Sequence, residues 1–441
     1  MTSVLFFAWK DQRFCFVCDW GTYDPGKDKE GEFMFISLSL ILAGGVAAGM
    51  IFRKMKLPGL LGMMLFGLLI GPYCLNLLDP TLLAGSGTIR KIALLIILIR
   101  AGLNLKIEDL KKAGRPALLL CFVPATFEIA AFIIFAPMLL GIDLVSAALM
   151  GCVMAAVSPA VVVPSMLKVM KAGYGQDKAI PQMILAGASA DDIYVLVLFS
   201  VLMSIAGQGS FEASTLLRLP TAILLGLGAG FLSGLLLVRL FSKEKKYESA
   251  AVNVIVILAF GLLFYGVEEA MTGPVAFSGL IAIMAACMVL GTRVPERIRS
   301  TAAGFDALWK AGEIFLFTLI GAAVNLPYAF KSFGVNVLLI VLCLLVRTAG
   351  VLLCVSFTRL SWKERLFCVA AYLPKATVQA AIGAVPLAAG LPAGEQILSC
   401  AVTAILITAP AGAILIDRGY TRLLTPPSSK KNESTTQNTS K

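Results

Sequence analysis

The sequence contains no histidine and few charged residues. Only 14% of its 441 residues are Asp, Glu, Lys or Arg, whereas 59% are hydrophobic; a soluble domain usually has about 25% charged residues. The missing imidazole excludes histidine-based metal sites and leaves proton chemistry to carboxylates, lysine or tyrosine. The sequence also has no nucleophile elbow and no phosphate-binding loop. We therefore expect neither an enzyme nor a bound cofactor.

Long apolar stretches recur along the whole chain, and each is long enough to cross a hydrocarbon core of about 30 Å. They predict an all-α polytopic membrane protein with about thirteen transmembrane helices. The predicted spans are Phe33–Phe52, Leu57–Leu78, Ile89–Leu105, Pro116–Leu140, Leu144–Val169, Ala179–Ala206, Leu216–Phe241, Ala250–Met271, Val275–Gly291, Gly304–Leu326, Phe333–Phe357, Glu364–Ala388 and Glu395–Ile416.

The net charge of +11 has a topological explanation and does not indicate nucleic-acid binding, because Lys and Arg gather in alternate loops between the spans. The positive-inside rule then places the N-terminus outside and the C-terminus in the cytoplasm of a plasma (inner) membrane. We expect an extracytoplasmic arm over 1–32, a transmembrane domain over 33–417 and a disordered cytoplasmic tail over 418–441. The arm holds Cys15 and Cys18, a C-x-x-C pair without the second pair that a zinc site needs.

Two adjacent acids lie near the middle of the sixth predicted span. Asp191 and Asp192 follow the small residues Gly187-Ala-Ser-Ala190, which leave space beside the helix. Two carboxylates cannot both be charged cheaply in a low-dielectric site. Such a site holds a proton or a small cation, but not both. This competition is the minimum chemistry for exchanging protons against cations, so the two acids are the predicted ion-binding and proton-binding residues.

Three other charges lie deep inside predicted spans. Glu128 in span four and Arg347 in span eleven most simply neutralise each other, as a buried ion pair that fixes one helix against another. Lys375 is the remaining deep cation and lies near a break in span twelve. Charges at such depth are expensive and mark functional sites.

Two spans contain paired prolines at mid-membrane, in Val157–Pro164 and in Leu373–Pro386. Proline removes a backbone donor, so each span is predicted to be interrupted. The interruptions fall at equivalent places if 33–206 and 250–416 are two repeats of opposite orientation, joined by a linker helix at 216–241. Paired interrupted helices in two halves are the strongest sequence indicator of a transporter's ion site.

At these residues the chain resembles the sodium/proton antiporters of the monovalent cation:proton antiporter superfamily, and most of all their NHA-type branch (solute carrier family 9, subfamily B). The resemblance runs from about Phe33 to about Asp417. The segments that carry it are Ser158-Pro-Ala-Val-Val-Val-Pro-Ser-Met166, Gly173-Tyr-Gly175, Gly187-Ala-Ser-Ala-Asp-Asp-Ile193, Leu345-Val-Arg347 and Pro374-Lys-Ala-Thr-Val-Gln-Ala-Ala-Ile-Gly383.

The resemblance implies a homodimer with an NhaA/NapA-like antiporter fold, in which crossed broken helices lie beside the ion site and exchange proceeds by elevator-type alternating access. It makes Asp192 the main ligand of Na⁺, Li⁺ or H⁺, and Asp191 an acid that pairs with a cation. Ser158, Pro159 and Thr377 would line the break, and Lys375 would face the acids. One departure is Arg347, where many electrogenic relatives have lysine. This leaves electrogenic and electroneutral exchange both open.

Three alternatives compete with a sodium/proton antiporter. A potassium/proton antiporter or a related monovalent cation transporter would use the same acids, since the sequence does not set selectivity. A receptor or sensor would need neither a pair of broken helices nor a deep acid pair. An enzyme is the least favoured, for the reasons given above.

Overall fold

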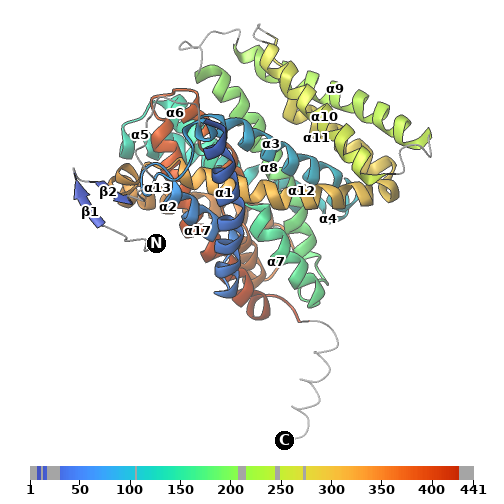
Figure 1. The fold of residues 1–441 in the computed structure, drawn as a ribbon. Coiled ribbons are helices and arrows are strands. Elements are labelled where there is room, and N and C mark those ends of the chain that lie inside the picture. Colours follow the sequence, from blue (N-terminus) through green and yellow to red (C-terminus); the bar gives the residue numbers. More distant parts are fainter. Residues whose placement is uncertain are drawn as a thin grey trace, which may run out of the picture.

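A computed structural model describes residues 7–10, 13–16, 30–104, 107–206, 215–243, 249–271 and 275–426 of the chain (Figure 1). The described residues are helical apart from turns, short extended stretches and a small hairpin. Strands β1 (Phe7–Lys10) and β2 (Arg13–Phe16) pair antiparallel, with Ala8 opposite Cys15. The hairpin was not predicted; its aromatic residues favour strands. Cys18, the other predicted member of the C-x-x-C pair, lies outside the described residues.

Eight helical segments of the described chain are long and apolar enough to cross a membrane. They are Phe33–Lys54, Pro80–Leu103, Gly114–Leu140, Leu144–Lys171, Pro220–Phe241, Ala250–Ala270, Leu326–Ser356 and Gly394–Leu423. This is fewer than the thirteen predicted spans. In the other predicted spans the helices are short, interrupted or charged, so they lack one continuous apolar stretch long enough to cross a membrane.

One group of helices packs together through a network of pairwise contacts. It comprises α1 (Glu30–Lys54), α2 (Gly59–Ile70), α3 (Pro80–Asn104), α9 (Thr215–Lys243), α10 (Ala250–Ala270), α11 (Gly279–Arg293) and α12 (Pro295–Ala322). In Figure 1, α9, α10 and α11 lie together at the upper right, beside α3. We call this group the scaffold. Helices α2 and α12 approach closely because each has glycine at the crossing: a Cβ on Gly67 or Gly321 would collide with the backbone of the other helix.

A second group, here called the core group, contains both predicted breaks. Its helices are α4 (Ile107–Leu120), α5 (Val123–Leu140), α6 (Leu144–Ala155), α7 (Pro159–Lys171), α8 (Ile180–Ala206), α13 (Leu326–Ser356), α14 (Trp362–Ala371), α15 (Thr377–Ile382), α16 (Val385–Ala388) and α17 (Gly394–Leu423). The core group contacts the scaffold mainly through α15, which packs on α3 and α12, and through α8, which packs on α9 and α11.

Several helix boundaries differ from the predicted spans: α2 ends at Ile70 and not at Leu78, α12 begins at Pro295 and not at Gly304, and α13 begins at Leu326 and not at Phe333. Helix α3 begins at Pro80, well before the predicted Ile89, because the Asp79 carboxylate caps it by accepting the Thr81 N–H at 2.7 Å. Helix α17 continues to Leu423, beyond the predicted end at Ile416. The predicted tail therefore begins inside this helix, and residues 427–441 lie outside the described part of the chain.

Candidate functional site

The two interruptions lie in the core group and touch each other. The first separates α6 from α7: the helix stops at Ala155 and restarts at Pro159, whose ring suits a first helical position. The second separates α14 from α15 over residues 372–376. The Ser158 N–H donates to the Pro374 carbonyl oxygen at 2.8 Å. The two breaks are thus hydrogen-bonded to one another, as backbone at this depth requires.

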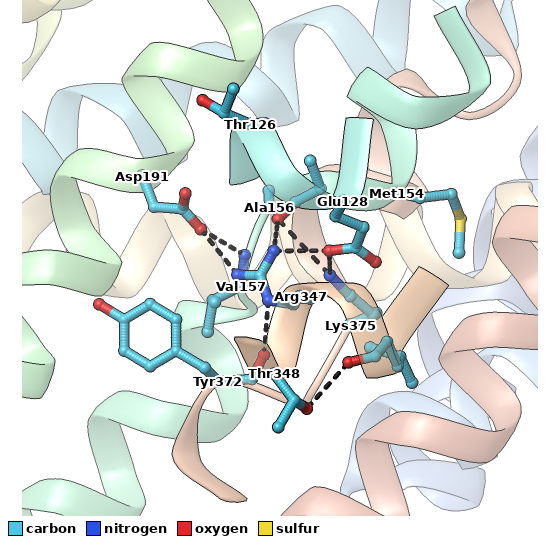
Figure 2. A network of polar contacts seen from close by, with 12 residues as sticks. Thr126, Glu128, Met154, Ala156, Val157, Asp191, Arg347, Thr348, Tyr372 and Lys375 are labelled. Carbon is cyan, nitrogen blue, oxygen red and sulfur yellow. Dashed lines mark hydrogen bonds and ion pairs between the residues drawn. The ribbon is translucent and has the colours of Figure 1, made fainter. Parts of the chain in front are cut away.

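Helix α8 carries both acids, and Asp191 contacts the first break. Asp191 is fully buried. Its Oδ2 accepts the Val157 N–H at 3.0 Å and lies 3.3 Å from Nη2 of Arg347 (Figure 2). The carboxylate is therefore held by one backbone donor from the break and one permanent cation from α13.

Asp192 has a different environment, since adjacent helical residues point about 100° apart. Its side chain is 4% exposed. Within the described part of the chain, its Oδ1 has no hydrogen-bond partner, and neither have Oδ1 of Asp191, Oγ of Ser158 and Oγ1 of Thr377. Buried polar atoms are normally satisfied. The breaks and the acid pair thus contribute several buried oxygens that could bind a cation.

A second cluster of charge lies on the other side of Arg347. Oε2 of Glu128 is 2.5 Å from Nη1 of Arg347 and 2.6 Å from Nζ of Lys375. All three side chains are at most 1% exposed. Figure 2 shows the Glu128 carboxylate between the two cations. The Glu128 carboxylate thus forms ion pairs with two cations, whereas the sequence predicted only the pair with Arg347.

Arg347 also donates hydrogen bonds to a backbone carbonyl at the end of each broken helix. Its Nε donates to the Tyr372 carbonyl at 3.0 Å, and its Nη1 donates to the Ala155 carbonyl. These carbonyls belong to helix ends, where backbone acceptors lack intrahelical partners. The planar guanidinium is suited to this because it presents five donors in a fixed geometry.

Lys375 lies differently from what the resemblance implied. Its ammonium contacts Glu128, whereas it was expected to face Asp191 and Asp192. Its backbone N–H donates to Oγ1 of Thr408 on α17 at 2.9 Å. This contact parallels the one at the first break, where a backbone N–H donates to a side chain of α8.

Three residues of the site were not singled out by the sequence reasoning. Tyr372 supplies a carbonyl to Arg347, Thr408 caps the second break, and Gln379 donates from Nε2 to the carbonyls of Ala156 and Met154 at 3.0 and 3.4 Å. The available signal for Gln379 was its polarity within an apolar span. Tyr372 and Thr408 carried no such signal.

The donor set fits a monovalent cation better than a tightly held transition metal. Among the described residues there is no group of three or more His, Cys, Asp or Glu side chains that could hold a metal ion. Hard cations bind oxygen, and the oxygens here come from two carboxylates and two hydroxyls. The site can hold a weakly bound cation, or a proton on a carboxylate.

Comparisons with known proteins identify the family of this chain. A family model described as "Sodium/hydrogen exchanger, transmembrane" matches residues 37–416. Sodium/hydrogen exchanger 9B2 of Homo sapiens is 32% identical over 414 residues, covering 91% of this chain and 76% of the relative. Sodium/hydrogen exchanger 9B1 of Homo sapiens is 30% identical, covering 86% of this chain and 76% of the relative.

A solved structure shares the fold. The sodium proton antiporter MjNhaP1 from Methanocaldococcus jannaschii superimposes with a TM-score of 0.79 at 21% identity, covering 89% of this chain and 99% of that one. The predicted resemblance to NHA-type exchangers is confirmed by the family model and the 9B relatives. The chain is an integral membrane protein that belongs to the sodium/hydrogen exchanger family.

Proposed function

We propose that this protein is a secondary transporter that exchanges Na⁺ or Li⁺ for H⁺ at Asp191 and Asp192. The observation that carries the proposal is the charge balance of the buried site. Glu128 and Asp191 are balanced by Arg347 and Lys375, whereas no described residue forms an ion pair or hydrogen bond with the Asp192 carboxylate.

An uncompensated buried carboxylate is costly unless it takes up a proton or a cation. Asp192 can take either, but the two compete for the same negative charge. Binding Na⁺ therefore releases H⁺, and binding H⁺ releases Na⁺. If the site opens alternately to the two sides, this competition is sufficient to couple the two fluxes.

The division of the helices supports an elevator mechanism. The breaks, the acids and their counter-charges all belong to the core group, whereas the scaffold contributes none of them. We propose that the core group moves past the scaffold and carries the ion with it. The boundary runs along α15 and α8, the elements through which the two groups mainly touch.

The same proposal includes the finer points of architecture. We propose thirteen crossings, with α2, α8, α11, α12 and the α14–α16 segment added to the eight long apolar spans. We further propose two inverted repeats, a homodimer, and a plasma-membrane orientation with the N-terminus outside. The parallel contacts of Val157 with Asp191 and of Lys375 with Thr408 support the repeats.

The test is exchange in proteoliposomes with Na⁺, Li⁺ and K⁺, at zero and at clamped membrane potential. We expect Na⁺ and Li⁺ to drive proton movement, and we expect Asp192→Asn to abolish it. Asp143→Asn, which changes an exposed acid at the start of α6, is the matched control and should keep wild-type exchange. Full exchange by Asp192→Asn would overturn the proposal, and exchange driven by K⁺ alone would change the substrate.

A further inference from the structure

The end of helix α6 leaves three consecutive carbonyls to be satisfied at mid-membrane. Residues 156–158 are not helical, so the carbonyls of Met154, Ala155 and Ala156 lack their usual partners. The Arg347 guanidinium donates a hydrogen bond to the Ala155 carbonyl. The other two accept hydrogen bonds from a single amide, Nε2 of Gln379, at 3.4 and 3.0 Å.

Gln379 is well placed for this role. It lies in the first turn of α15, directly after the second break, and its side chain is 0% exposed. Its Oε1 has no hydrogen-bond partner among the described residues. The side chain therefore reaches from the second broken span to the first.

The contact with Ala156 has a consequence for Asp191, because one peptide unit separates them. The carbonyl of Ala156 and the N–H of Val157 belong to the same peptide group, which is planar and holds the two bonds pointing in opposite directions. Gln379 fixes the carbonyl, and the N–H on the opposite edge donates to Oδ2 of Asp191 at 3.0 Å. Figure 2 shows the contact between Val157 and the Asp191 carboxylate as a dashed line.

We propose that Gln379 is a positioning residue of the ion site, which sets the orientation of the Ala156–Val157 peptide and thereby holds the Asp191 carboxylate in place for the cation. The inference rests on the proposed exchange function and adds a residue that touches neither acid. Without the Gln379 donor, the peptide is free to rotate toward another acceptor. Asp191 then loses its backbone hydrogen bond and keeps only Arg347.

The test is Gln379→Met, which preserves the length of the side chain but removes its donor. We expect the apparent KM for Na⁺ to rise about fivefold, the equivalent of about 1 kcal/mol for one positioned hydrogen bond, with a maximal rate within about twofold of the wild type. Thr403→Val is the control: it removes a buried hydroxyl of α17 that donates only to the carbonyl of Ser399 in its own helix. We expect its KM to be unchanged.

The outcomes separate this inference from the function on which it rests. A Gln379→Met variant with a wild-type KM overturns the positioning role while leaving the exchange function intact. A parallel fall in maximal rate and in folded yield, with unchanged KM, would mean that Gln379 only stabilises the fold and would also overturn it. Loss of Na⁺-driven exchange in the wild type would instead refute the proposed function.

Discussion

The shared carboxylate of Glu128 makes a quantitative prediction about stability. Glu128→Gln removes the negative charge that lies 2.5 Å from Arg347 and 2.6 Å from Lys375. Two buried cations then face each other with only Asp191 to balance them. Removing one partner of a buried ion pair typically costs about 3–5 kcal/mol, so we expect the free energy of unfolding to fall by about that amount.

The companion change, Lys375→Met, leaves Glu128 paired with Arg347, and we expect a smaller loss of about 1–3 kcal/mol. In the double variant, Arg347 and Asp191 remain as a neutral pair at 3.3 Å. The double variant should therefore be more stable than the sum of the single losses implies, with a coupling energy of about 1–3 kcal/mol.

The assay is a double-mutant cycle on the free energy of unfolding, measured by denaturant titration in detergent micelles. The control cycle combines Glu128→Gln with Asp143→Asn, which lies beyond the far end of α5, and should be additive within about 0.5 kcal/mol. If the Glu128 and Lys375 changes are also additive within about 0.5 kcal/mol, the shared-carboxylate interpretation is wrong.

Three further predictions test other parts of the structure. Gly187→Ala adds a Cβ that would collide with the Tyr372 hydroxyl and lie 2.9 Å from Cβ of Leu120, so the free energy of unfolding, measured by thermal unfolding, should fall by about 1–3 kcal/mol. The control is Gly228→Ala, whose added Cβ would have no atom within 4 Å and which should be neutral or stabilising. Asp192→Asn should abolish stabilisation by Na⁺, which for the wild type is about 1.4 kcal/mol at ten times Kd; an undiminished Na⁺-dependent rise in melting temperature would contradict this. Partial burial acts to raise the pKa of Asp143, but hydrogen bonds from the Ser146 hydroxyl and the N–H groups of Ser146 and Val145 outweigh it and hold that pKa below its ordinary value of 3.8. The ionised Asp143 carboxylate therefore stabilises the fold fully above pH 3.8, and this contribution is lost as the pH falls through the lowered pKa. Asp143→Ala should lower the free energy of unfolding by about 1 kcal/mol at neutral pH and should also remove this acid dependence. Asp143→Asn keeps a capping oxygen, so it should remove only the acid dependence.

The sequence was sufficient for the positions of most helices because apolar length and proline are local signals. The break between α6 and α7 follows from Pro159 and the small residues before it. The start of α3 was missed because Gly85-Ser-Gly87 has the composition of a loop. The helix forms there nonetheless, because the Asp79 carboxylate caps it and the Asp79 backbone N–H donates to the Ser37 hydroxyl at 2.9 Å.

The site was partly predictable for a similar reason. In a chain with few charges, Glu128, Asp191, Asp192, Arg347 and Lys375 stand out by their depth alone. Their partners are another matter, because each contact joins segments that are far apart in the sequence. Nothing local indicates that Lys375 reaches Glu128 and not Asp192, or that Gln379 reaches the end of α6. These contacts depend on which helices cross, and only the folded arrangement specifies that.

The contacts of Arg347 explain why position 347 holds arginine, and they bear on how much charge is moved in each transport cycle. Its guanidinium contacts Glu128, Asp191 and the carbonyls of Ala155 and Tyr372 at once. A lysine ammonium has only three donors at one point and cannot span four acceptors from different helices. Arginine also stays protonated throughout a transport cycle. Position 347 is therefore a fixed positive charge of the site. Lys375 is the other buried cation, and its ammonium contacts Glu128 and lies 3.5 Å from the Ala155 carbonyl. If Lys375 also keeps its proton throughout, only the carboxylates exchange protons with the two sides. Under that condition the stoichiometry depends on whether Asp192 acts alone or together with Asp191, which the clamped-potential measurement distinguishes.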